Sequence, residues 1–117
     1  MTKATLRSCV LLALAPALAV LAGGVAAASS SPLGTWMKAN MGASLAAQDF
    51  PTLRKNFDFL ATRPPPGSDF PGWSQLAKSG SAAAAKEDPA ATKAACNGCH
   101  DAYKARYKKD FAARPFP

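Results

Sequence analysis

The stretch AACNGCHDAYKARYKKDF, residues 94–111, is the most informative part of this sequence. It has the apolar spacing of a helix and contains two cysteines and a histidine. Cys96 and Cys99 are three residues apart, and Cys96 and His100 are four apart, so a helix brings all three side chains to one face. Such a group could hold a zinc ion, cycle as a dithiol or attach a haem covalently. The rest of the sequence distinguishes among these three uses.

The amino-terminal segment, residues 1–28, has the layout of a secretory signal peptide. Lys3 and Arg7 are followed by a continuous apolar run and then by three alanines that end at Ala28. A membrane anchor is the alternative, but the apolar run is short for a membrane span. We therefore expect cleavage after Ala28, export to the periplasm and one mature domain, residues 29–117, without stable membrane insertion.

The cysteine count then narrows the choice. Cys9 leaves with the signal peptide, so the mature chain keeps only Cys96 and Cys99 and has no disulfide framework. A domain this small usually needs a covalent or metal staple. A structural zinc site needs four ligands, and a thioredoxin-type dithiol needs a βαβ context, neither of which this sequence supplies. The pattern C-x-x-C-H predicts one covalent haem c, with His100 as an iron ligand.

Four segments of the mature chain have helical spacing and a starting signal, and no segment has a convincing strand pattern. Ser31, Asp49 and Asp88 are expected as N-caps, each with a proline one or two residues later, and Pro71 is expected to open the third segment. Four such segments with short connections predict an all-α, antiparallel four-helix bundle, with the haem c near the carboxy-terminal helix. The expected helices span residues 32–48, 50–63, 71–87 and 89–111.

Few residues of the mature chain could serve as a second ligand of the haem iron. His100 is the only histidine, and no methionine follows it in the chain. A methionine ligand must therefore come from Met37 or Met41, which lie one turn apart in the first segment. Spacing does not choose between the two. If neither binds, the iron is five-coordinate and open to small gases.

The ending CNGCHDAYKARY resembles the C-x-x-C-H-x-x-Y-[RK] motif of the class II cytochromes c, the cytochrome c′ and cytochrome c-556 group. The resemblance implies thioether bonds at Cys96 and Cys99 and proximal iron ligation by His100. The stretch WMKANM is similar to the ligand segment of the six-coordinate branch, which implies that Met37 binds the iron and that Met41 lines the pocket. The resemblance also implies haem contacts for Trp73, Tyr103 and Lys104.

These features predict a periplasmic electron carrier rather than an enzyme. The alternative is a five-coordinate haem protein that binds nitric oxide or carbon monoxide. The formal net charge of +7 falls to +5 without Lys3 and Arg7, which suits transient encounters with acidic redox proteins. Nucleic-acid binding is not expected, because the sequence has no known nucleic-acid-binding motif beside its positive charge. A homodimer is left open.

Overall fold

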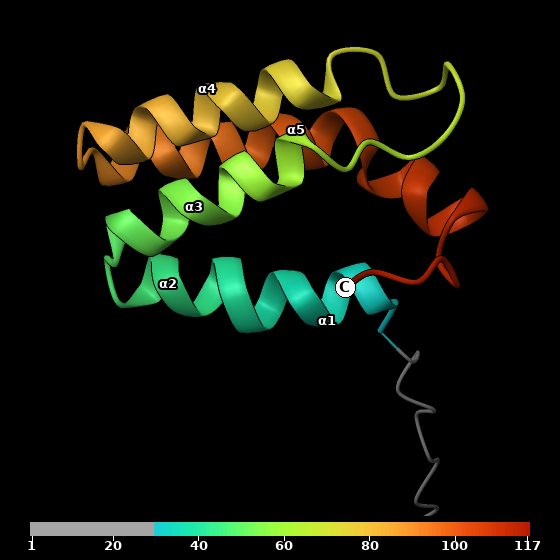
Figure 1. Cartoon of the computed structure of the whole chain (residues 1–117), viewed down its shortest axis with the longest axis horizontal. Helices are drawn as coiled ribbons and strands as arrows, with labels where there is room; N and C mark the ends of the chain where they lie inside the picture. Colours follow the sequence, from blue (N-terminus) through green and yellow to red (C-terminus); the bar gives the residue numbers. More distant parts are fainter. Residues whose placement is uncertain (1–29) are drawn as a thin grey trace, which may run out of the picture.

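The computed structural model describes residues 30–117, and all of the regular structure in that range is helical (Figure 1). The predicted all-α class is therefore confirmed for this part of the chain. Three short elements follow one another without a break and form a first helical segment, and three longer helices come after it. The elements are α1 (Pro32–Trp36), the π-helical turn η1 (Met37–Gly42), α2 (Ala43–Ala46), α3 (Phe50–Ala61), α4 (Trp73–Ala85) and α5 (Pro89–Asp110).

Side-chain caps start three of the four segments, as predicted. Ser31 accepts a hydrogen bond from the backbone N–H of Gly34, at 3.0 Å. Asp49 and Asp88 make the equivalent bonds three residues ahead, at 3.1 and 3.0 Å. Each bond satisfies one of the backbone donors that a helix leaves unpaired at its first turn.

The third helix begins two residues later than predicted. Pro71 does not open it; α4 starts at Trp73 with Gly72 as its N-cap. Gly72 has a φ of +77°, a left-handed conformation that glycine adopts without steric cost. The chain therefore turns sharply at Gly72, and the Pro71 carbonyl points away from the helix and accepts a hydrogen bond from the Tyr103 hydroxyl.

The helices pack in sequence order, which is consistent with a helical bundle. The first segment packs on α3, α3 packs most extensively on α4, and α4 packs on α5. Gly80 permits the close approach of α3 and α4, because a Cβ atom at that position would overlap the ring of Phe57. Leu53 and Thr92 are the most completely buried side chains of the described residues.

The segment after α5 returns to the first helical segment and closes one end of the bundle (Figure 1). Phe116 packs edge-on against Trp36, with ring centroids 5.2 Å apart, and against Phe59 at 6.0 Å. The tail therefore links the end of α5 to the first segment. Among residues 30–117, no helix is long and apolar enough to cross a membrane. The predicted signal peptide lies outside the described residues.

Gly80→Ala is expected to destabilise the protein. A better helix former contributes about 1 kcal/mol, but overpacking against the Phe57 ring costs about 1–3 kcal/mol. Gly42→Ala is the matched control: its Cβ would meet only the Met37 carbonyl oxygen, at an ordinary 3.7 Å, so it is expected to stabilise by up to about 1 kcal/mol. The changes in unfolding free energy relative to the wild type, measured in urea, should have opposite signs for the two variants, and equal changes would contradict the close packing.

Candidate functional site

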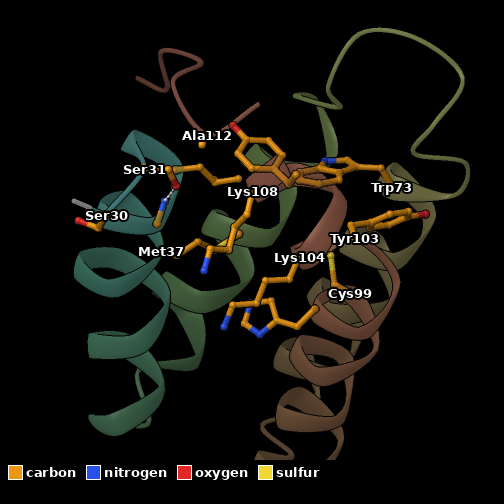
Figure 2. A pocket seen from close by; sticks show the side chains of 13 residues that line it. Ser30, Ser31, Met37, Trp73, Cys99, Tyr103, Lys104, Lys108 and Ala112 are labelled. Carbon is orange, nitrogen blue, oxygen red and sulfur yellow. Dashed lines mark hydrogen bonds between the residues drawn. The ribbon is translucent and has the colours of Figure 1, made fainter. Parts of the chain in front are cut away.

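A pocket of about 420 Å³ lies between the first helical segment and α5 (Figure 2). This volume falls in the range typical of small-molecule and cofactor sites. Leu33, Gly34 and Met37 line it from the first segment, and Trp73 lines it from α4. The lining is mostly apolar. The α5 side supplies Cys99, His100, Tyr103, Lys104, Tyr107 and Lys108.

The cysteine–histidine motif lies in the middle of α5 rather than at its start. Cys99 and His100 line the pocket, whereas Cys96 is half-buried and packs against the hydrophobic core. Both cysteines carry free thiols. Gly98 lies on the exposed side of the helix, where a Cβ would meet nothing within 4 Å. The helix thus brings the motif to one side, as its spacing predicts, although only two of its three functional side chains reach the pocket.

The two candidate methionines have different surroundings. Met37 is half-buried and lines the pocket opposite Cys99 and Tyr103 (Figure 2). Met41 is only 7% exposed, belongs to the hydrophobic core and does not line this pocket. Of the two thioethers, the one at Met37 therefore faces the side of α5 that carries His100.

A π-helical turn contains both methionines, and residue spacing does not predict it. Within η1 the backbone bond from the Ala43 N–H reaches back five residues to the Lys38 carbonyl. Two asparagine amides supply further donors to this wide turn: Asn40 donates to the Trp36 carbonyl at 3.0 Å, and Asn56 of α3 donates to the Asn40 carbonyl at 3.3 Å. Such turns occur frequently at functional sites.

Trp73 forms the wall of the pocket on the α4 side. Its indole N–H donates to the Leu60 carbonyl at 2.8 Å, at the end of α3. Its ring packs on those of Tyr103 and Tyr107, with centroids 5.6 and 6.4 Å apart. Trp73 and Tyr103, which were predicted to contact a haem, thus both line the pocket and also pack against each other.

Basic side chains dominate the charged part of the lining. Lys104 and Lys108 extend from α5 into the space between the helices (Figure 2). None of the residues that line the pocket is acidic. Partial burial lowers the pKa of His100, and the charge of Lys104 lowers it further, while Asp101 opposes the shift. The imidazole therefore favours its neutral form, which is the form that binds metals.

The two thiols are held in their protonated form. Burial raises the pKa of Cys96, and burial together with the neighbouring Cys96 raises the pKa of Cys99. Thiols of dithiol redox catalysts instead have lowered pKa values, usually because they lie at a helix N-terminus or beside a cation. This pair therefore lacks the electrostatic environment of an exchange catalyst.

No group of three or more His, Cys, Asp or Glu side chains within residues 30–117 is arranged to hold a metal ion. Comparisons with known proteins leave the family open: no protein-family model matches the chain, and no curated protein or solved structure is significantly similar to it.

Trp73→Phe is expected to lower the free energy of unfolding by about 0.5–1.5 kcal/mol, because it removes the indole hydrogen bond to the Leu60 carbonyl, which keeps its bond from the Arg63 N–H. Trp36→Phe is the control: Trp36 is half-buried, and phenylalanine keeps a ring against Phe59 and Phe116. Chemical denaturation of both variants under the same conditions measures the difference. Equal losses would show that the indole hydrogen bond adds nothing to the packing.

Proposed function

We propose that this chain is a periplasmic electron carrier of the class II cytochrome c type, with one haem c bound covalently at Cys96 and Cys99. Its mature part, residues 29–117, would then be an antiparallel four-helix bundle. The observation that carries the proposal is a single pocket that has Cys99 and His100 on one side and Met37 on the other. His100 is the proximal ligand in this proposal, and Met37 is the distal one.

The residues present fit a haem. The pocket is mostly apolar, as a flat hydrophobic macrocycle requires, and lies between two helices, a common place for cofactors in helical bundles. Two thiols whose pKa values are raised by burial and an imidazole whose pKa is lowered by burial occur on one helix. When bound, haem iron accepts and donates single electrons, and a methionine–histidine pair raises its reduction potential.

The protein would then control how water and redox partners reach the haem, the polarity around it, and the ligands of its iron. Leu33 and Trp73 keep water from the buried side of the pocket. Lys104 and Lys108 have long stems that cover apolar surface while their ammonium groups reach solvent, which gives the rim positive charge. A positive rim favours brief encounters with an acidic redox protein.

The other uses of the motif have less support. A zinc site has less support because the described residues hold no group of three or more His, Cys, Asp or Glu side chains arranged to bind a metal ion. A dithiol catalyst lacks the lowered thiol pKa that such chemistry needs. The main alternative is a five-coordinate haem iron that binds small gases. In that alternative no methionine sulfur binds the iron, whereas the electron carrier has one.

The optical spectrum of periplasmically matured protein tests the proposal. We expect covalent haem, a low-spin ferric spectrum with the weak far-red sulfur-to-iron band, and no response of the ferrous form to carbon monoxide. Met37→Leu should abolish the far-red band and give a ferrous form that binds carbon monoxide. The buried volume changes little in this substitution, so stability should fall by less than about 1.5 kcal/mol apart from the loss of the ligand.

Met41→Leu is the matched control, since it makes the same chemical change one turn away in the core. It should keep the far-red band and the wild-type insensitivity to carbon monoxide. The opposite pattern would assign the ligand to Met41. A high-spin wild-type spectrum that shifts with carbon monoxide would contradict electron transfer and support gas binding. Absence of haem from the matured protein would instead support a metal-binding or dithiol role for the motif.

A further inference from the structure

The two methionines of the first helical segment point to different places. In a regular α-helix, residues four apart lie on one face, so Met37 and Met41 would have similar surroundings. Here Met37 lines the pocket, whereas Met41 is buried in the hydrophobic core and does not line it. Both belong to η1, in which a backbone N–H reaches back five residues rather than four. This wider winding changes the angle between the two side chains around the helix axis.

Side-chain donors hold the wide turn at the two peptide units that precede the methionines. The Asn40 amide donates to the Trp36 carbonyl at 3.0 Å, and this carbonyl belongs to the peptide unit that joins Trp36 to Met37. Asn56 of α3 donates to the Asn40 carbonyl at 3.3 Å, and that carbonyl belongs to the peptide unit that joins Asn40 to Met41. The backbone before each methionine therefore receives a bond that regular helical winding does not supply.

The two hydrogen bonds act in series from α3 to the turn. Asn40 accepts from Asn56 through its carbonyl and donates to Trp36 through its side chain, so one residue carries both bonds. Both asparagines are half-buried, and the first helical segment packs on α3. Neither asparagine lines the pocket. Any effect they have on a group bound there is therefore transmitted by the backbone of the turn.

We propose that Asn40 and Asn56 are positioning residues for Met37, because they hold the turn in the winding that presents the Met37 thioether to the pocket. This inference rests on the proposed function, in which Met37 binds the haem iron, and adds the residues that keep this ligand in place. Loss of either hydrogen bond would let the turn relax toward α-helical winding. The Met37 sulfur would then leave the iron in a larger fraction of molecules.

Imidazole binding to the ferric form of the intact, matured protein measures that fraction. Imidazole must displace Met37, so its apparent affinity rises with the fraction of molecules whose iron is free of the methionine. Met37→Leu has no thioether to displace and gives the upper limit. Asn56→Leu keeps the approximate size of the side chain and removes its donor. It should raise the apparent affinity about two- to tenfold, the equilibrium effect of one lost hydrogen bond, and Asn40→Leu should do the same.

A double-mutant cycle separates positioning from a general loosening of the bundle. A residue that acts through Met37 has no effect once Met37 is replaced, so Asn56→Leu should leave the imidazole affinity unchanged in a Met37→Leu background. Ser74→Ala is the matched control. It removes another partly buried side-chain bond to a backbone carbonyl, from Ser74 to Ala61 at 2.6 Å, which joins α4 to the end of α3. It should keep the wild-type imidazole affinity.

Three results would overturn the positioning role while Met37 remains the ligand: unchanged affinity in both asparagine variants, a rise that persists in the Met37→Leu background, or an equal rise in Ser74→Ala. Equal imidazole affinities of the wild type and Met37→Leu would instead overturn the proposed ligation, and this inference with it. A matured protein without haem would have the same meaning. If Asn40→Leu does not fold, Asn56→Leu and its double mutant still decide the question.

Discussion

The indole of Trp73 connects three helices at the edge of the pocket. Its N–H is bonded to the last turn of α3, its ring stacks on two tyrosines of α5, and its own helix begins at that residue. The left-handed turn at Gly72 directly precedes Trp73, and the Tyr103 hydroxyl donates a hydrogen bond to the Pro71 carbonyl in the same turn. The pocket wall is therefore rigid where α5 passes it.

The opposite wall is built differently. The first helical segment packs on α3, while α5 packs on α4, so the two walls of the pocket belong to helices that share few direct contacts. The tail links them directly, through Phe116 on Trp36. The side chains that line the apolar pocket of about 420 Å³ lack the dispersion contacts that they would make with packed neighbours. A molecule bound in the pocket would restore these contacts.

The sequence predicted local features well and distant ones poorly. The caps at Ser31, Asp49 and Asp88 followed from residues one to three positions away, and the structure confirms them. The start of α4 was misplaced because its turn depends on Tyr103, more than thirty residues later in the chain. Which methionine faces the pocket likewise depended on a π-turn that residue spacing does not reveal.

That turn has a consequence for how the chain can vary. A π-helical stretch holds more residues per turn than an α-helix, so η1 accommodates length that regular winding would not. Each residue added to or removed from an α-helix rotates everything beyond it by about 100°. In the first segment, the direction of Met37 relative to the core side chains after it is thus set by the number of residues in Met37–Gly42 as much as by their identity. Insertions and deletions, more than substitutions, would therefore change which side chain of this segment faces the pocket.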